Sequence, residues 1–149
     1  MKKLFVYYSN TGNGDKVSEY FEKKGFDIRK VEQKKELPKS FFFKIMAGGF
    51  LAGIHHKPKL VNFDPDVSAY DEIVIGSPIW NGLPACPINT VLRDTDISGK
   101  KVAFVLYSGG GTAPKAVKML KENYNANVVE LMEPKKNPEF GKILDPFFS

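Results

Sequence analysis

The chain has 149 residues, of which 42% are hydrophobic and 26% charged, a composition typical of one globular domain over residues 1–149. A single cysteine excludes internal disulfides, and with only two histidines a metal site of the Cys/His type is disfavoured. The net charge of +5 comes almost entirely from lysines, with only two arginines, which favours solvated helix faces over a nucleic-acid site.

The charge is unevenly distributed along the chain. Residues 1–60 carry 13 Lys/Arg against 6 Asp/Glu, and residues 101–149 carry 7 against 5. Residues 61–100 carry 2 against 6 and are therefore acidic. The distribution, and not the total, is what a partner would meet.

No secretion signal or membrane span is predicted. The apolar run at residues 4–8 is too short for the core of a signal peptide. The most apolar stretch, residues 41–54, has 14 residues and contains a lysine, whereas a spanning helix needs about 20. We therefore expect a cytoplasmic protein without membrane insertion.

The first predicted unit is a strand, a tight loop and a helix. Residues 4–8 are a continuous run of β-branched and aromatic residues, typical of a buried strand, and turn residues follow at 9–14. Apolar residues then recur at helical spacing from Val17 to Phe21, and Gly25 can end the helix.

Two less regular segments come next. Residues 26–31 alternate in charge, which predicts an edge strand. Residues 43–54 have apolar residues at helical spacing, which predicts a helix packed on the sheet, with a membrane-surface or partner-binding helix as the alternative. His55 and His56 lack nearby Cys, Asp or Glu and are expected in a surface loop.

The second half of the chain continues the alternation of strands and helices. Strands are predicted at residues 72–76, 101–107 and 128–132. One helix is predicted over residues 85–93, where Cys86 is expected to pack as a small apolar residue. A second is predicted to begin after an N-cap at Thr112. A third, short helix is predicted in the proline-containing tail. This order predicts an α/β fold, a doubly wound five-stranded parallel sheet with helices on both faces.

The loops after the first, third and fourth strands are the candidate ligand site, because such sheets bind ligands at the carboxyl ends of their strands. The loop at residues 9–15 can direct backbone N–H groups at an anion from a helix N-terminus. It has no Lys or Arg before Lys16, so it suits a monophosphate held by neutral donors. A plain turn that caps the helix is the alternative.

Other phosphate-binding patterns are absent from the sequence. There is no P-loop, and Val17 stands where a dinucleotide fingerprint needs its third glycine. Cys86 lies outside the loop, which disfavours a cysteine phosphatase. A phosphoacceptor domain would need an aspartate where Gly76 and Ser77 end the third strand.

At these three loops the sequence resembles the flavodoxin family. The resemblance covers about residues 3–132 and rests on the segments Tyr8-Ser9-Asn10-Thr11-Gly12-Asn13, Gly76-Ser77-Pro78-Ile79-Trp80 and Tyr107-Ser108-Gly109-Gly110. It implies the strand order 2-1-3-4-5 and bound FMN, with the 5′-phosphate in the first loop and the ring between the other two. The implied FMN-binding residues are Ser9, Asn10, Thr11, Gly12, Asn13, Gly14, Ser77, Pro78, Ile79, Trp80, Asn81, Gly82, Ser108, Gly109, Gly110 and Gly111.

Four of these residues raise specific expectations. Gly14 departs from the family, which usually has threonine, so a hydroxyl donor is lost while the backbone N–H stays. Trp80 is implied as a ring contact, with a packing role as the alternative. The Asn81-Gly82 peptide is flexible enough to reorient beside the flavin.

The resemblance implies an electron-transfer protein whose flavin cycles between oxidised, semiquinone and hydroquinone states. Its partners would be redox proteins, a reductase and an acceptor. An FMN-dependent NAD(P)H:quinone-type oxidoreductase and a binding module without flavin are the alternatives. No residues of the chain are expected to be catalytic, because the flavin would carry the chemistry. The pI of about 9.2 differs from that of acidic electron shuttles, but residues 61–100 could still form an acidic rim around the flavin.

Overall fold

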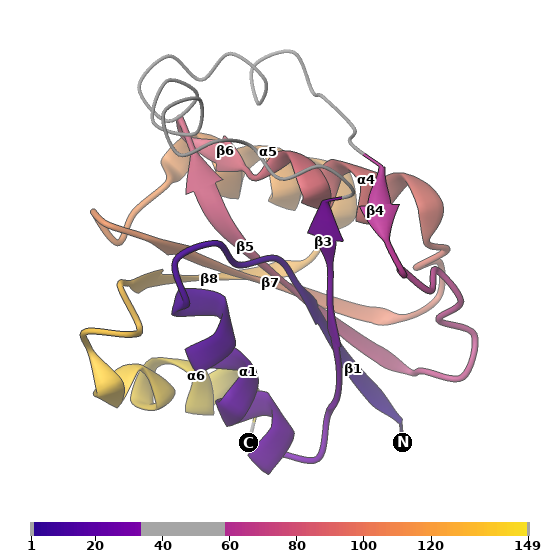
Figure 1. Ribbon diagram of the computed structural model, residues 1–149, viewed down its shortest axis with the longest axis horizontal. Helices are drawn as coiled ribbons and strands as arrows, with labels where there is room; N and C mark the ends of the chain where they lie inside the picture. Colours follow the sequence, from indigo (N-terminus) through magenta and orange to yellow (C-terminus); the bar gives the residue numbers. More distant parts are fainter. Residues whose placement is uncertain (1, 34–58, 149) are drawn as a thin grey trace.

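Five parallel strands form the centre of the molecule. The structure is a computed structural model that describes residues 2–33 and 59–148 (Figure 1). The strands lie in the order β2-β1-β5-β7-β8, and their bounds are Lys3–Tyr7 for β1, Asp27–Lys30 for β2, Glu72–Trp80 for β5, Lys101–Ser108 for β7 and Asn127–Met132 for β8. This is the predicted order 2-1-3-4-5, which is confirmed.

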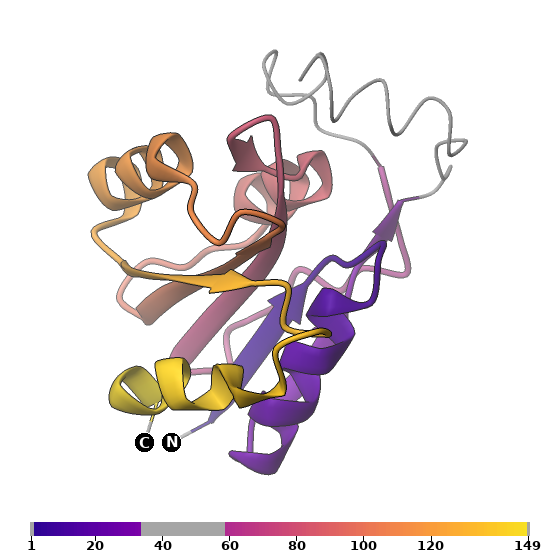
Figure 2. The same cartoon turned by 90° about the vertical axis from the view of Figure 1, so that its left-hand side faces the viewer.

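Helices cover both faces of the sheet, as predicted. Figure 2 shows α1 (Asn13–Lys23) and α6 (Gly141–Phe148) on one face, and α4 (Cys86–Asp94) and α5 (Pro114–Tyr124) on the other. Each face has its own apolar core. A short 3₁₀ turn, Pro138–Phe140, precedes α6. Because both faces are covered, the three central strands β1, β5 and β7 are apolar along most of their length.

The predicted glycine end of the first helix is confirmed. Gly25 has a φ of 87°, the left-handed conformation that glycine adopts without steric cost. The N–H groups of Gly25 and Phe26 donate to the carbonyls of Glu22 and Phe21, at 3.0 Å each. This is the Schellman arrangement that satisfies the last carbonyls of a helix.

The predicted N-cap of the helix that follows the fourth strand is wrong. Thr112 does not cap α5, whose N-cap residue is Ala113. The Ala113 N–H donates instead to a Glu130 carboxylate oxygen at 2.6 Å. A side chain from the neighbouring β8 therefore satisfies this helix end, which local sequence spacing could not indicate.

The third strand of the sheet is longer than predicted. β5 continues through Ser77 and Pro78 to Trp80, and then turns back onto β6 (Leu83–Pro84) as an antiparallel hairpin. The predicted loop at 77–82 is therefore mostly strand. Asn81 and Gly82 form its two-residue turn with φ values of 51° and 81°, the positive values that a type I′ turn requires.

A small second sheet pairs β3 (Glu32–Gln33) with β4 (Leu60–Val61). The helix predicted at 43–54, with His55 and His56, lies outside the described residues, and a single domain over 1–149 stays a prediction. None of the described helices is long and apolar enough to span a bilayer.

Gly76 is the point where the sheet tolerates no side chain. A Cβ at this position would lie 2.7 Å from Cζ of Phe5, whose ring is fully buried and stacks on Phe21 with centroids 4.4 Å apart. We expect Gly76→Ala to lower the free energy of unfolding by about 1–3 kcal/mol in urea denaturation. The matched control is Gly110→Ala, where a Cβ meets no described atom within 4 Å; an equal loss in both variants would contradict this account.

Candidate functional site

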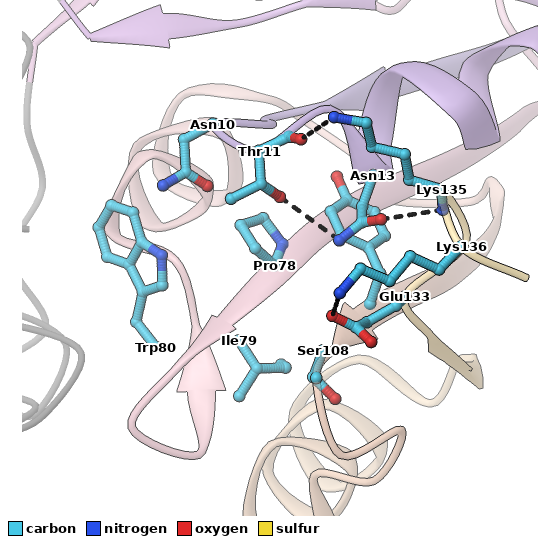
Figure 3. Close-up of a pocket in the computed structure, with 12 residues that line it drawn as sticks. Asn10, Thr11, Asn13, Pro78, Ile79, Trp80, Ser108, Glu133, Lys135 and Lys136 are labelled. Atoms are coloured by element: carbon cyan, nitrogen blue, oxygen red, sulfur yellow. Dashed lines mark hydrogen bonds and ion pairs between the residues drawn. The ribbon is translucent and has the colours of Figure 1, made fainter. Parts of the chain in front are cut away.

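A cleft of about 530 Å³ opens at the carboxyl ends of the central strands (Figure 3). Its volume lies within the range of about 300–1,000 Å³ that is usual for small-molecule sites. The lining residues come from the carboxyl-terminal ends of β5 and β7, from the loops that follow β1, β7 and β8, and from the start of α1. They are Asn10, Thr11, Asn13, Pro78, Ile79, Trp80, Tyr107, Ser108, Gly109, Glu133, Lys135 and Lys136. All three predicted loops therefore meet at one cleft.

The loop after β1 is held in shape by its own serine. The Ser9 hydroxyl oxygen accepts hydrogen bonds from the N–H groups of Gly12, at 3.2 Å, and Gly14, at 3.1 Å. The N–H groups of Asn13 and Asp15 lie in the first turn of α1, where a helix offers no acceptor, and they have none among the described residues. These two groups can therefore serve an anion.

Gly14 is enclosed by the side chains around it and does not line the cleft. A Cβ there would lie 2.5 Å from the Tyr107 hydroxyl oxygen, 2.7 Å from Cβ of Ser9 and 2.8 Å from a ring carbon of Tyr7. The departure from threonine is therefore more than the loss of a hydroxyl. The neighbouring tyrosines occupy the space that a side chain would need.

Tyr107 crosses from β7 to the loop after β1. Its hydroxyl donates a hydrogen bond to the Tyr8 carbonyl, and its side chain is buried. Burial, with Tyr7 and Asp15 nearby, raises the pKa of Tyr107 well above its usual value. The phenol is therefore protonated at neutral pH and keeps its donor role there.

The Asp15 carboxylate stabilises the loop after β1 and does not line the cleft. Its carboxylate accepts the Tyr7 hydroxyl at 2.7 Å and pairs with the Lys30 ammonium at 3.0 Å. Partial burial acts to raise the pKa of Asp15, but these two partners outweigh it and lower the pKa. Burial and the bond to Asp15 raise the pKa of Tyr7 to about 12.

The loop predicted after the third strand divides into two parts. Pro78 and Ile79 are half-buried and present apolar surface to the cleft. Trp80 also lines it, but its side chain is only 1% exposed and stands edge-on to the Tyr8 ring, with centroids 5.8 Å apart. Ser77 is buried, donates to the Pro78 carbonyl and accepts the Ala85 N–H, so the structure gives it a role in holding the hairpin.

Asn81 and Gly82 do not line the cleft. They form the hairpin turn, and reorienting the peptide between them would give a type II′ turn, which has glycine at its first central position. That position is occupied by Asn81. The structure thus disfavours the expected peptide reorientation at this dipeptide.

The loop after β7 is divided in the same way. Ser108 and Gly109 line the cleft, whereas Gly110 and Gly111 do not. Ser108 accepts the Gly111 N–H at 3.0 Å, and a Cβ on Gly111 would lie 2.8 Å from Cβ of Met132. A Cβ on Gly109 would meet no described atom within 4 Å, so this part of the rim is open.

The loop after β8 also reaches the cleft and was not predicted from the sequence. Glu133, Lys135 and Lys136 line the cleft, although the sequence indicated only solvated lysines here. The available signal was the parallel order of the sheet, because the carboxyl end of a fifth strand beside the fourth reaches the same edge. Tyr107 was also missed as a lining residue.

A family model described as flavodoxin matches residues 51–137, which is more than half of the chain. The chain belongs to the flavodoxin family. Comparison of the sequence with curated proteins gave no match.

Solved structures resemble this flavodoxin over most of its length. A protein of Bacteroides uniformis shares 26% identity over 85% of each chain, with a TM-score of 0.73. A flavoprotein of Lactobacillus acidophilus, solved in complex with FMN, shares 23% identity over 94% of this chain and 98% of its own, with a TM-score of 0.68. The apo form of the flavoprotein from the same organism shares 27% identity over 86% and 88%, with a TM-score of 0.60.

The cleft of this flavodoxin fits FMN, the cofactor that the sequence implied. Its first-turn N–H groups at Asn13 and Asp15 suit a phosphate, and the surface of Pro78 and Ile79 suits a flat ring. The two features lie at the ends of strands β1 and β5, which are neighbours in the sheet. The family match supports the same cofactor.

Restoring the threonine of the family at position 14 tests the packing around Gly14. We expect Gly14→Thr to lower the free energy of unfolding by about 2 kcal/mol or more, because overpacking displaces Tyr107 and Ser9. Gly14→Ala should give a smaller loss of the same sign in urea denaturation. If Gly14→Thr had the stability of the wild type, the packing around Gly14 would be looser than the structure indicates, and this account would be wrong.

The ion pair of Asp15 predicts a pH dependence of stability. A carboxyl with a lowered pKa in the folded state stabilises above its unfolded pKa of about 3.9, and this contribution is lost as the pH falls through the folded value. We expect Asp15→Asn to cost about 1 kcal/mol at pH 7 and less at pH 3, because the contribution decreases as the pH falls below the unfolded pKa. Glu22→Gln, on the exposed side of α1, is the control, and a cost that is the same at both pH values contradicts the assignment.

Proposed function

We propose that this flavodoxin binds FMN in the cleft and transfers electrons between redox partner proteins. One observation carries the proposal: the cleft joins a helix N-terminus with N–H donors to an apolar surface at the switch point of the sheet. This is where a doubly wound fold binds a nucleotide-like cofactor. FMN, when bound, supplies one- and two-electron redox chemistry.

The residues of the chain would bind and orient the cofactor. At the phosphate end, the N–H groups of Asn13 and Asp15 act as donors, and Ser9 keeps the loop in the shape that directs them. At the ring end, Pro78 and Ile79 exclude water from one surface of the ring. Trp80 supports that surface from behind, because its own side chain is buried.

The rim of the cleft supports contact with partner proteins. Gly109 and Gly110 carry no side chain and are exposed, so a partner can approach the ring edge closely, and transfer of electrons needs no group of the chain to react. The NAD(P)H:quinone-type reductase remains the alternative for the same cleft. Its distinguishing property is turnover of NAD(P)H without an added reductase.

The prediction that residues 61–100 form an acidic rim around the flavin is wrong. Asp66, Asp94 and Asp96 lie together near Lys100, which precedes β7 and so marks the opposite, amino-terminal edge of the sheet. Among the residues that the structure describes, the charged ones that line the cleft are Glu133, Lys135 and Lys136. A redox partner would therefore meet a rim with a net positive charge, which favours an acidic docking surface on that partner.

Titration with FMN tests whether the chain binds this cofactor, and the variant Ile79→Asp tests whether the flavin ring lies on the surface of Pro78 and Ile79. We expect the wild-type protein to bind FMN and to show a visible absorption band. A carboxylate on the apolar ring surface should weaken FMN and riboflavin alike, by about tenfold. Ile143→Asp, at a half-exposed position outside the cleft, should leave both affinities unchanged.

Two results would contradict the proposal in different ways. If repeated reconstitution with FMN gave no binding, the chain would be a binding module without flavin. If the FMN-loaded protein oxidised NAD(P)H in steady state with a quinone and without any reductase, the oxidoreductase alternative would replace the electron carrier.

A further inference from the structure

The turn that follows β8 is fixed by several independent contacts. Glu133 has a φ of 37°, which is uncommon for a residue other than glycine and is maintained only where the surroundings enforce it. Its carbonyl accepts the N–H groups of Lys136 and Asn137, at 2.8 and 3.0 Å. The Asn137 side chain donates to the Met132 carbonyl at 2.8 Å, and Pro134 is buried. The turn therefore presents its two lysines in a defined position.

Lys135 connects this turn to the loop after β1. Its backbone N–H donates to the Asn13 side-chain oxygen at 3.0 Å, and its ammonium donates to the Thr11 carbonyl at 3.4 Å (Figure 3). The ammonium also lies 3.5 Å from the Cβ position of Gly12. A cation from a position 124 residues away in sequence thus stands beside the predicted phosphate loop.

The two lysines of the turn differ in their electrostatic partners. The Lys136 ammonium pairs with the Glu133 carboxylate at 3.5 Å. Lys135 has no carboxylate partner within the part of the chain that the structure describes. Its charge is therefore available to an anion in the cleft, whereas that of Lys136 is partly compensated.

The loop after β1 has a reduced set of its own donors. Ser9 takes the N–H groups of Gly12 and Gly14, and the crowding at Gly14 excludes a threonine hydroxyl. A phosphate monoester carries a charge of about −1.5 to −2 at pH 7. The donors that remain in this loop are neutral, so a nearby cation would add a charge-assisted bond to the phosphate.

We propose that Lys135 binds the phosphate group of the flavin and makes this cleft selective for the phosphorylated cofactor. The inference rests on the proposed binding of FMN and adds a charged ligand from the loop after β8. Because a lysine ammonium forms a charge-assisted bond with phosphate, the selectivity for FMN over riboflavin depends on Lys135. Asn13 is a positioning residue, since its side chain fixes the backbone of Lys135.

Parallel titrations with FMN and riboflavin test the role of Lys135. We expect Lys135→Met to weaken FMN about tenfold and to leave riboflavin unchanged, because the backbone N–H that contacts Asn13 is retained. Lys135→Arg should recover most of the FMN affinity. Lys142→Met, which removes the same charge from a lysine that faces Glu139 outside the cleft, should bind both ligands as the wild type does.

Inorganic phosphate provides a second readout of the same site. Phosphate should compete with FMN in the wild-type protein and compete less in Lys135→Met, and added salt should weaken FMN more in the wild type. Retained riboflavin binding shows that the variant is folded.

The outcomes separate this inference from the function on which it rests. If the wild type binds FMN and Lys135→Met binds it equally well, the role of Lys135 is refuted while the cofactor stands. If Lys135→Met loses riboflavin and FMN to the same extent, Lys135 is a structural latch and the proposal also fails. If the wild type binds neither flavin, the proposed function fails as well.

Discussion

The hydrogen bond from the Tyr107 hydroxyl to the Tyr8 carbonyl is the contact on which the candidate site depends. It joins the end of β7 to the end of β1 across the intervening β5. The tyrosine is buried and its pKa is raised, so its hydroxyl is a donor at neutral pH. Its hydroxyl fills the space beside Gly14, which explains why glycine stands at that position of the helix N-terminus.

This contact also determines how the loop after β1 is built. With no room for a side chain at Gly14, the Ser9 hydroxyl can reach its N–H and that of Gly12. Hydrogen bonds within the loop therefore hold its shape, and the N–H groups of Gly12 and Gly14 that make these bonds are not available to a ligand. Lys135 is a cation that the fold brings beside this loop from the other end of the chain.

The sequence was sufficient for the layers of the fold and for three of the four loops. Continuous apolar runs and turn residues identify the strands at β1, β5 and β7, and the parallel order then brings their ends together. The sequence did not predict contacts that depend on a residue far away in the chain. The cap of α5 comes from Glu130, and the space beside Gly14 is filled by a residue of β7; neither can be found from local spacing.

The charge of the chain shows the same limit of local patterns. Counting along the sequence finds an acidic segment at residues 61–100, but its carboxylates lie at the amino-terminal edge of the sheet. The lysines after β8 lie at the cleft, because β8 runs parallel to β7 and ends at the same edge. A parallel sheet therefore separates the two charge clusters by strand direction: residues that precede a strand face one edge, and residues that follow a strand face the other. For that reason the lysines after β8 stand at the candidate cleft of this flavodoxin, and Asp66, Asp94 and Asp96 of the acidic segment do not.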